Sequence, residues 1–386
     1  MDARFLDGNQ LQLLKNGTEY FPALITAIAG ATKEIFLETY IFSDDETGRA
    51  VASALSAAAR RGVLVHLLVD GFGSKDMFRE TRVQLVNAQV QVLIYNPKLS
   101  AIPLRRNRLR RLHRKLVVID GRVAFIGGIN IIADMDTPGL TPPRYDYAVR
   151  IEGPLLALLL REVQRLWNRL AWVNLHWQWR SRTSAPRVTT FLRGQRAALV
   201  IRDNILHRGE IEDAYLEAID QAESEIIIAN AYFLPGQRFR QALLRAAGRG
   251  VRVVLLLQGR QEYLLLYFAT HALYGQFLDA GIVVSEYHKS FLHAKVAVID
   301  QRWSTVGSSN IDPFSLLLAR EANLIVDDPG FAEELRASLE LHIDNGATVV
   351  AKTLWHQQPL WKRMVTWIAY GFVRLLIGLA AFDRKY

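Results

Sequence analysis

The feature that most constrains the fold of this chain is an internal repeat. The segment HRKLVVIDGRVAFIGGIN begins at His113, and HAKVAVIDQRWSTVGSSN begins at His293, 180 residues later. Four polar positions keep this offset: His113/His293, Lys115/Lys295, Asp120/Asp300 and Asn130/Asn310. A repeat on this scale predicts two copies of one structural unit.

Two further pairs of segments upstream keep the same order. AAARRGVLVHLLVDG, ending at Gly71, is similar to AAGRGVRVVLLLQG, ending at Gly259, with an offset of 188. EIFLETYIF is similar to EIIIANAYF, and aligning Tyr40 with Tyr232 gives an offset of 192. The segments occur in the same order in both halves, but the offset between them changes from one pair to the next. This predicts two copies of one unit with loops of different length.

Each copy alternates short apolar runs with Ala- and Leu-rich stretches. IFLETYIF, LVHLLVD and QVLIY are typical of buried strands, and residues 48–62 and 238–250 predict helices that stop at glycine. The alternation predicts an α/β sandwich in each half. A polar stretch at 179–190 predicts a boundary, which gives lobes over residues 1–183 and 184–350 and a basic, apolar tail over 351–386.

Composition excludes several classes of protein. The 386 residues are 50% apolar, contain no cysteine, and carry 47 basic against 38 acidic groups. This excludes a disordered chain, a disulfide-stapled scaffold and a thiol nucleophile. The sequence also lacks the series of long apolar runs that would predict a polytopic membrane protein. The formal charge of +9 indicates an anionic partner. The N-terminus has no apolar segment typical of a secretory signal, so we expect a cytosolic orientation.

The repeated motif carries residues suited to phosphate chemistry. His and Lys two positions apart on a strand lie on the same face. The aspartate seven positions after each His is at an odd spacing and begins a turn, which predicts a structural brace. A glycine-bearing turn follows in each copy, at Gly127, Gly128 and Asn130 or Gly307, Ser308 and Asn310, and can approach an anion closely. The alternative, ordinary surface side chains, does not explain why polar identities recur while apolar ones vary.

The paired H-x-K-x4-D-x6-G-[GS]-x-N motifs resemble the phospholipase D superfamily over nearly the whole chain. GNQLQLLKNGTEYFPAL, ANAYFLPG and VGSSNIDPFSLLLAREANLIV are most similar to bacterial cardiolipin synthases of the shorter B type. The resemblance implies two α/β/α sandwich lobes related by pseudo-twofold symmetry, with both motifs in one active site at their interface. It also implies phosphodiester exchange through a phosphohistidine, with no metal and no cofactor.

The resemblance also implies residue roles. It makes His113 the nucleophile and His293 the general acid and then base, although the sequence itself is symmetric. Two imidazoles can share nucleophilic and proton-transfer roles, and Lys and Asn can neutralise phosphoryl oxygens. The expected catalytic set is His113, Lys115, Asp120, His293, Lys295 and Asp300, supported by Asn130, Asn310, Ser308 and Gly128.

Each histidine also needs an acidic partner for its other ring nitrogen. In the family this residue lies downstream of each motif. Asp146 is the predicted partner of His113, and Glu321 that of His293. The alternative is that both are surface charges at strand ends. Gly128 replaces the family's serine in the first copy and removes one hydroxyl donor.

The motif alone does not separate lipid from nucleic acid as substrate. Residues 98–115 hold eight basic residues and no acidic one, including Arg105, Arg106, Arg108, Arg110 and Arg111. Lipid headgroups or nucleic-acid phosphates suit such a segment, as does a solvated loop. Residues 166–180 place Trp172, Trp177 and Trp179 among basic residues, a pattern typical of a membrane interface, of a stacking platform or of core packing.

The C-terminal segment favours a lipid partner. An apolar run of 18 residues from Val365 to Phe382 is interrupted by Arg374, and Trp367 lies near its start. A central arginine disfavours a membrane span, so we expect this tail to lie in the membrane interface; a buried helix is the alternative. Residues 262–281 are also apolar and could form core or an acyl-chain groove.

These features together predict a peripheral enzyme on the cytoplasmic side of a bacterial inner membrane. The expected reaction transfers a phosphatidyl group from phosphatidylglycerol to a second lipid hydroxyl, forming cardiolipin and releasing glycerol. A phospholipase D hydrolase or headgroup exchanger with the same site, and a nucleic-acid phosphodiesterase, are the alternatives. We expect anionic phospholipid and a membrane surface as partners and regard nucleic acid as the weaker prediction.

Overall fold

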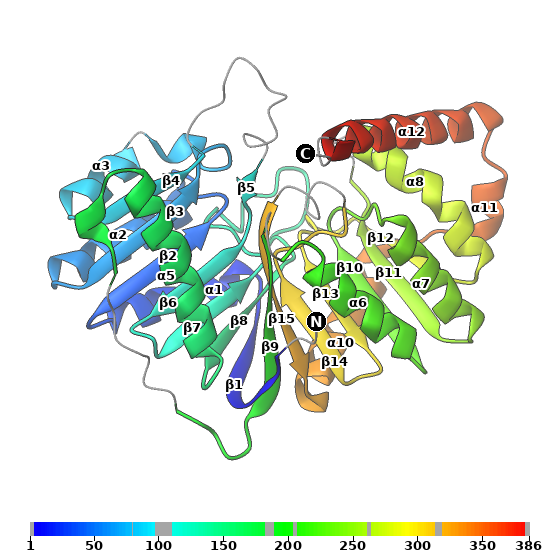
Figure 1. The fold of residues 1–386 in the computed structure, drawn as a ribbon. Coiled ribbons are helices and arrows are strands. Elements are labelled where there is room, and N and C mark those ends of the chain that lie inside the picture. The colour runs from blue at the N-terminus through cyan, green and yellow to red at the C-terminus, as the bar shows by residue number, and fades with distance from the viewer. Residues whose placement is uncertain are drawn as a thin grey trace.

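The computed structural model describes residues 4–78, 80–96, 110–181, 189–203, 207–260, 264–312 and 319–382. Apart from the short strand β5 in the first half, both halves of the chain follow the same order of elements (Figure 1). The first half contains β1 (Leu6–Lys15), α1 (Asn16–Ala29), β2 (Glu34–Thr39), α2 (Glu46–Arg60), β3 (Leu64–Asp70), α3 (Glu80–Asn87), β4 (Gln91–Tyr95), β5 (Arg111–Leu112), β6 (Lys115–Ile119), β7 (Val123–Gly127), β8 (Tyr147–Glu152) and α5 (Leu156–Val173).

The second half repeats this order and then continues. It contains β9 (Gln195–Arg202), α6 (Glu210–Gln221), β10 (Glu225–Asn230), α7 (Gln237–Gly248), β11 (Arg252–Gln258), α8 (Leu264–Asp279), β12 (Val283–Tyr287), β13 (Lys295–Ile299), β14 (Trp303–Gly307), β15 (Ala319–Asp327) and α10 (Pro329–Gly346). The last elements are β16 (Ala347–Val349), α11 (Lys352–His356) and α12 (Leu360–Phe382).

The two halves share one continuous sheet. Its strand order is β16-β12-β11-β10-β13-β14-β15-β9-β1-β8-β7-β6-β2-β3-β4, with β5 paired to β15 outside this path. Apart from β16, the order reads alike in both directions from the antiparallel β1–β9 pair at its centre. This arrangement agrees with the predicted pair of α/β lobes and with their pseudo-twofold relation, and the lobes are joined edge to edge.

Helices cover both faces of the sheet. Core residues of α5 and α10 form one apolar cluster that extends across both halves. On the other face, α1 and α2 bury their apolar sides in the first half, and α6, α7 and α8 do so in the second. The core therefore consists of one shared layer and two lobe-specific layers.

The structure confirms the prediction that two helices end at a glycine. The predicted helix over 48–62 is α2, and the one over 238–250 is α7. Gly62 (φ 91°) and Gly250 (φ 90°) follow these helices in the left-handed region, where a side chain would be strained.

Strand register corrects one offset predicted from the repeat. Glu34 pairs with Leu64 in the first half, and Glu225 pairs with Arg252 in the second, so β2 and β10 are 191 residues apart. The offset of 192 was wrong by one residue because it aligned two tyrosines instead of the strands. Tyr40 therefore corresponds to Ala231, and Ile41 corresponds to Tyr232.

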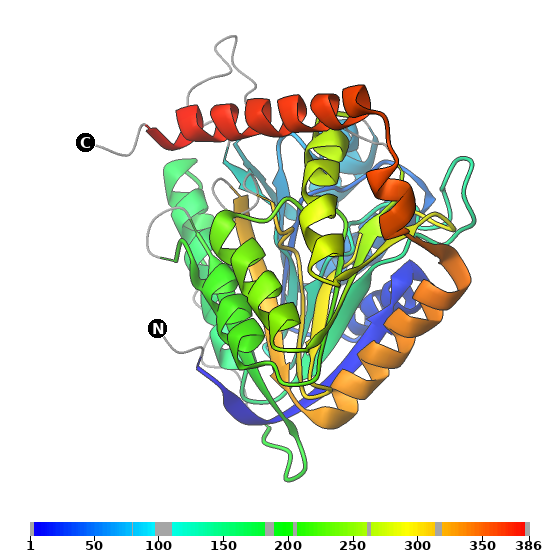
Figure 2. The same cartoon turned by 90° about the vertical axis from the view of Figure 1, so that its right-hand side faces the viewer.

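The last helix, α12, lies across α8 at one end of the molecule (Figure 2). Val373 is buried against the core of the second half, and the hydroxyl of Tyr370 accepts a hydrogen bond from Arg240. No helix in the described part of the chain combines the length and apolar character needed to span a bilayer.

Candidate active site

The first catalytic strand is attached to the second half of the chain. β5 pairs in parallel with β15, and the backbone N–H of His113 donates to the carbonyl of Arg320 at 3.0 Å. Asp70, at the end of β3, accepts from the Leu112 N–H at 2.8 Å. His113 is thereby held at the junction of the two lobes.

The second catalytic strand is attached to the first half in the same way. The backbone N–H of His293 donates to the carbonyl of Tyr145 at 2.8 Å, and the N–H of Tyr145 donates to the carbonyl of Phe291 at 2.9 Å. Arg320 and Tyr145 each directly precede an acidic residue, Glu321 and Asp146. Each lobe therefore brings a carboxylate to the other lobe's histidine.

The structure reverses the predicted acid–histidine pairing. Nδ1 of His113 lies 2.9 Å and 3.1 Å from the two carboxylate oxygens of Glu321, and Nδ1 of His293 lies 2.6 Å from Oδ2 of Asp146. The prediction that each acid serves the histidine of its own repeat was wrong. The reason is that the segment carrying each acid pairs with the segment before the other lobe's histidine, through β15 with β5 and through the bridge of Tyr145 with Leu292, which sequence distance along one repeat does not reveal.

The residue after the first motif glycine, Ser308 in one copy and Gly128 in the other, differs in size according to the carboxylate that it contacts. Ser308 donates its hydroxyl to Glu321 at 2.5 Å. At the corresponding Gly128, an added Cβ would lie 2.3 Å from a carboxylate oxygen of Asp146. Glycine is required there because the aspartate occupies the space where a serine side chain would begin.

The two lysines are buried between the lobes. Lys115 and Lys295 each donate to the backbone carbonyl of the histidine two residues before it, Lys115 at 2.7 Å. Burial, followed by the charge of Lys295, lowers the pKa of Lys115 to about 7, although Glu321 opposes the shift. The site therefore concentrates positive charge where little water reaches it.

Burial is also the main influence on the other charged groups. It lowers the pKa of His113, and it lowers that of His293 well below the usual value, with Lys295 as the next cause. It raises the pKa of Asp146 to about 6. In the free enzyme both imidazoles thus favour the neutral form, which suits His113 as a nucleophile, whereas His293 can act as a general acid only after it takes up a proton.

The two aspartates of the motif act as structural braces, as their odd spacing predicted. Asp120 accepts from the backbone N–H groups of Thr32, Lys33 and Glu34 at 2.8–2.9 Å. Asp300 accepts from the corresponding groups of Glu223, Ser224 and Glu225, each at 2.9 Å. These contacts fix the loop before β2 and β10, so the placement of both aspartates among the catalytic residues was wrong.

The two asparagines lie buried beside the motif. Asn130 Oδ1 accepts from the Ile41 N–H at 3.1 Å, so this side chain also orders the chain after β2. Asn310 is buried, and its Oδ1 has no hydrogen-bond partner within the described residues. The amide oxygen of Asn310 can therefore still accept a hydrogen bond, whereas the equivalent oxygen of Asn130 already binds a backbone N–H.

Sequence reasoning missed two residues of the site. Asp70 anchors β5, and the Tyr40 ring packs edge-on against His113 with centroids 4.9 Å apart. Both follow buried strands at their carboxyl ends, which is the position where sites form in such sheets. Their place at the carboxyl ends of predicted strands is a sequence signal that could have identified both residues.

The predicted membrane-binding residues fall into three groups. Arg105, Arg106 and Arg108 lie outside the described residues. Trp172 and Trp177 are 63% and 61% exposed, whereas Trp179 is partly buried and stacks on His176 at 4.0 Å. Arg110 and Arg111 flank the start of β5, and Trp367 and Arg374 are exposed on α12.

The site can perform phosphoryl-group exchange with its own side chains. In each histidine, Nδ1 faces a carboxylate, which leaves Nε2 as the nitrogen available to a substrate. Two lysines supply cations for the phosphoryl oxygens. Within the described ranges, no three His, Cys, Asp or Glu side chains form a group that could hold a metal ion.

Comparison with known proteins agrees with this geometry. Residues 24–167 and 215–343 match the family model described as "Cardiolipin synthase, PLD-like domain". The chain is 41% identical to cardiolipin synthase B of Escherichia coli K12 over 97% of this chain and 90% of that protein. It is 31% identical to cardiolipin synthase A of Klebsiella pneumoniae over 96% of this chain and 76% of that protein.

A solved structure shares the fold. Phosphatidylserine synthase of Haemophilus influenzae superposes with a TM-score of 0.73 at 15% identity, over 98% of this chain and 97% of that one. The paired motifs, the family match and the relatives lead to the same conclusion: this chain belongs to the cardiolipin synthase family of phospholipase D-like proteins.

Proposed function

We propose that this protein is a phosphatidyltransferase that forms cardiolipin from two molecules of phosphatidylglycerol and releases glycerol. The observation that carries the proposal is the pair of histidines, each oriented by a carboxylate from the other lobe, beside two buried lysines. The relatives named cardiolipin synthase B support this choice of substrate.

The first step attaches the phosphatidyl group to the enzyme. Nε2 of His113 attacks the phosphorus of the first phosphatidylglycerol, and the bond from phosphorus to the glycerol oxygen breaks. His293 donates a proton to that oxygen, and glycerol leaves. Lys115 and Lys295 neutralise the charge on the remaining phosphoryl oxygens.

The second step returns the enzyme to its starting state. His293 accepts the proton from a glycerol hydroxyl of a second phosphatidylglycerol, whose oxygen attacks the phosphorus. The phosphorus–nitrogen bond breaks, and its electron pair returns to His113. Both carboxylate oxygens of Glu321 face the His113 ring, which supports His113 as the residue that becomes positively charged when phosphorylated.

The distribution of exposed apolar side chains supports binding to a membrane surface. On α12, Trp361, Met364, Ile368, Phe372 and Leu375 recur at helical spacing and are exposed. Arg363 and Arg374, three turns apart, lie along one border of this row. An apolar helix face bordered by arginines is typical of a helix that lies in the headgroup region of an anionic bilayer.

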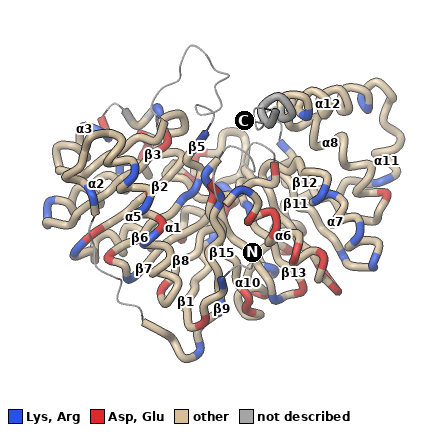
Figure 3. The backbone as a smooth tube through the Cα atoms, viewed as in Figure 1, with Lys and Arg blue, Asp and Glu red and all other residues tan. Residues whose placement is uncertain are grey.

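Other features at the same end of the molecule support this orientation. Arg110 and Arg111 lie at the start of β5, near the end of the molecule where α12 lies (Figure 3). Trp172 and Trp177 follow at the carboxyl end of α5. Because His113 directly follows β5, this end would face the substrate bilayer, and we propose peripheral attachment to the cytoplasmic side.

The test is to incubate the purified protein with phosphatidylglycerol vesicles and follow cardiolipin, phosphatidic acid and glycerol by mass spectrometry. We expect equal amounts of cardiolipin and glycerol, and a His113→Ala variant that forms neither. Phosphatidic acid without cardiolipin would show a hydrolase instead. A phosphoenzyme trapped on His293 would reverse the assigned roles.

A further inference from the structure

One arginine near His293 has no role in the chemistry described above. Arg144 is half-buried, and its guanidinium carbon lies over the ring of Phe291, 5.0 Å from the ring centroid. The Phe291 ring in turn stacks on His293, with centroids 6.1 Å apart and an angle of 22° between the ring planes. Arg144 and His293 therefore lie next to the same aromatic ring.

The charge of Arg144 reaches His293 and is not cancelled by an ion pair. Burial and then Lys295 are the main causes of the lowered pKa of His293, and Arg144 also contributes to the shift. None of the described Asp and Glu side chains forms an ion pair with Arg144. Burial raises the pKa of Asp134 to about 6, although Gly17 and Arg144 oppose the shift, and its carboxylate accepts from the Gly17 N–H at 2.9 Å. The guanidinium can therefore bind an anion.

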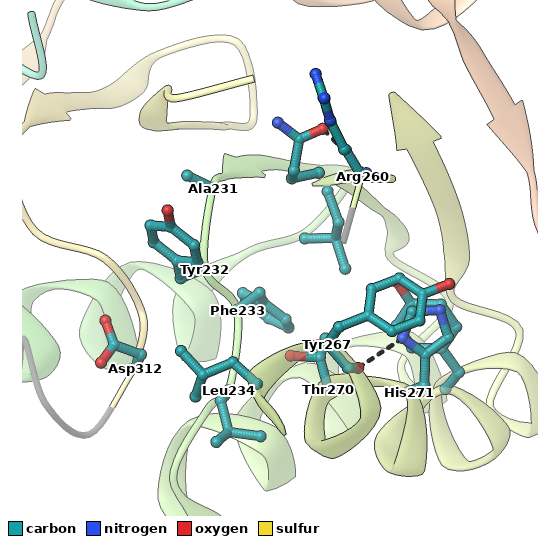
Figure 4. A pocket seen from close by; sticks show the side chains of 13 residues that line it. Ala231, Tyr232, Phe233, Leu234, Arg260, Tyr267, Thr270, His271 and Asp312 are labelled. Atoms are coloured by element: carbon teal, nitrogen blue, oxygen red, sulfur yellow. Dashed lines mark hydrogen bonds between the residues drawn. The ribbon is translucent and has the colours of Figure 1, made fainter. Parts of the chain in front are cut away.

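The segment that carries this arginine is fixed between the lobes. Nη2 of Arg144 donates to the carbonyl of Asp136 at 3.0 Å. Arg260, which lies at one end of the pocket shown in Figure 4, donates from the second lobe to the carbonyl of Pro138 at 3.0 Å. These bonds hold residues 136–144 of the first lobe against the second, so the lobe interface sets the position of the guanidinium.

The pseudo-twofold symmetry of the site breaks at this arginine. Two residues before the carboxylate of each lobe, the chain has Arg144 in one copy and Ala319 in the other. The ring beneath the guanidinium differs as well, because Phe291 corresponds to Arg111, which lies over Phe72 of its own lobe at 5.0 Å. On one side of the site, an arginine of one lobe thus packs on a ring of the other lobe, whereas on the second side both partners come from one lobe.

The two steps of the proposed reaction make different demands on the His293 side. The group that leaves in the first step is glycerol, which carries no charge. The acceptor in the second step is a glycerol that carries a phosphodiester, and three carbons separate this phosphate from the reacting hydroxyl. When the hydroxyl lies at Nε2 of His293, the acceptor phosphate lies farther out, where a guanidinium one side chain beyond the imidazole can bind its oxygens.

We propose that Arg144 binds the phosphate of the acceptor lipid and thereby selects phosphatidylglycerol over free glycerol as the acceptor. The inference rests on the proposed function and extends it with a specificity-determining residue. Phe291 supports the guanidinium from one side, and the Asp136 carbonyl takes one of its donors, which leaves N–H groups of Nη1 and Nη2 for the phosphate oxygens.

A comparison of two soluble acceptors tests this role. Phosphatidylglycerol vesicles supply the donor, and either isotope-labelled glycerol or glycerophosphoglycerol supplies the hydroxyl. Exchange of labelled glycerol into phosphatidylglycerol needs both histidines but no second phosphate. The variants are Arg144→Met and Arg144→Lys, and the matched control is Arg238→Met, at an exposed, ion-paired arginine of the second lobe. Thermal melting of each variant verifies folding.

We expect Arg144→Met to keep glycerol exchange within about twofold of the unmodified enzyme. Its kcat/KM for glycerophosphoglycerol should fall by about tenfold or more, mainly through KM, as loss of a charged hydrogen bond implies. Cardiolipin formation should fall in parallel. Arg144→Lys keeps the charge without the planar fork and should lose less. The control should match the unmodified enzyme with both acceptors.

Three results would overturn the assignment of Arg144. An equal loss with both acceptors would show a residue that only maintains the site, and unchanged use of glycerophosphoglycerol by Arg144→Met would show that no phosphate binds there. A loss of cardiolipin formation without a loss of transfer to glycerophosphoglycerol would place Arg144 at the membrane surface instead. If the unmodified enzyme forms no cardiolipin, the proposed function itself fails, and the acceptor assignment fails with it.

Discussion

Nδ1 of His113 lies 2.9 Å from Oε1 of Glu321, a residue 208 positions later in the chain. The reciprocal contact joins His293 to Asp146 at 2.6 Å, across 147 positions. Neither lobe therefore contains a complete histidine–carboxylate pair of its own. Assembly of the two lobes into one sheet is what completes each pair, so catalysis depends on the interface between them.

The crossed pairing predicts distinct defects for the two carboxylates. Glu321→Gln should impair phosphorylation of His113, and Asp146→Asn should impair proton transfer by His293, each by about 10²–10⁴-fold because the imidazole loses its orienting charge. The glycerol burst measures the first step, in which both histidines act, so both variants should slow it. Decay of the phosphoenzyme measures the second step, in which Asp146→Asn should slow proton acceptance by His293. A burst defect in Asp146→Asn with none in Glu321→Gln would contradict this assignment.

The pKa shifts predict a narrow pH profile. Asp146, with its pKa raised to about 6, must ionise to orient His293, so kcat/KM should rise as pH increases through that value. Lys115, with its pKa lowered to about 7, must stay protonated to bind phosphate, so kcat/KM should fall above it. Lys115→Arg should move the alkaline limb to higher pH because arginine stays charged. A flat profile across both values would count against the prediction.

The two motif aspartates should affect stability more than chemistry. Asp120→Ala or Asp300→Ala removes an acceptor for three backbone N–H groups and should lower the free energy of unfolding by about 3 kcal/mol. Urea denaturation measures the loss. The glycerol burst per folded molecule should stay within about twofold, and its complete loss in a folded variant would return these residues to the catalytic set.

Gly128 and Ser308 should tolerate substitution differently. Gly128→Ser brings a side chain onto the Asp146 carboxylate and should reduce turnover by about 100-fold or more through displacement of His293. Ser308→Ala removes one hydrogen bond to Glu321 and should cost about tenfold. Steady-state cardiolipin formation compares the two variants. Equal activity of Gly128→Ser and the unmodified enzyme would show that the acid can move aside.

The exposed face of α12 should determine membrane binding. Ile368→Glu places a charge in the apolar row and should weaken sedimentation with phosphatidylglycerol vesicles by about tenfold. Leu192→Glu, at a fully exposed leucine outside this helix, is the control and should bind as the unmodified protein does. Equal binding by both variants would show that another surface contacts the bilayer.

The internal repeats and the alternation of apolar runs with Ala- and Leu-rich stretches were sufficient to predict two α/β lobes. The repeated motif predicted the paired histidines and lysines and the bracing role of Asp120 and Asp300. These predictions depend on local geometry: the period of a strand places His113 and Lys115 on one face, and a turn follows at a fixed distance. The family resemblance added the expectation of a shared site. The information on the paired residues and the braces is contained within about twenty consecutive residues of each copy.

Tertiary structure alone decided which carboxylate serves which histidine. Glu321 reaches His113 because β5 pairs with β15 across the lobe interface, a contact between residues about 200 positions apart. Strand register aligns Tyr40 with Ala231, whereas the similarity of two tyrosines in the sequence had aligned it with Tyr232. Local periodicity does not encode such long-range pairing, since register is set by how whole strands pack against one another.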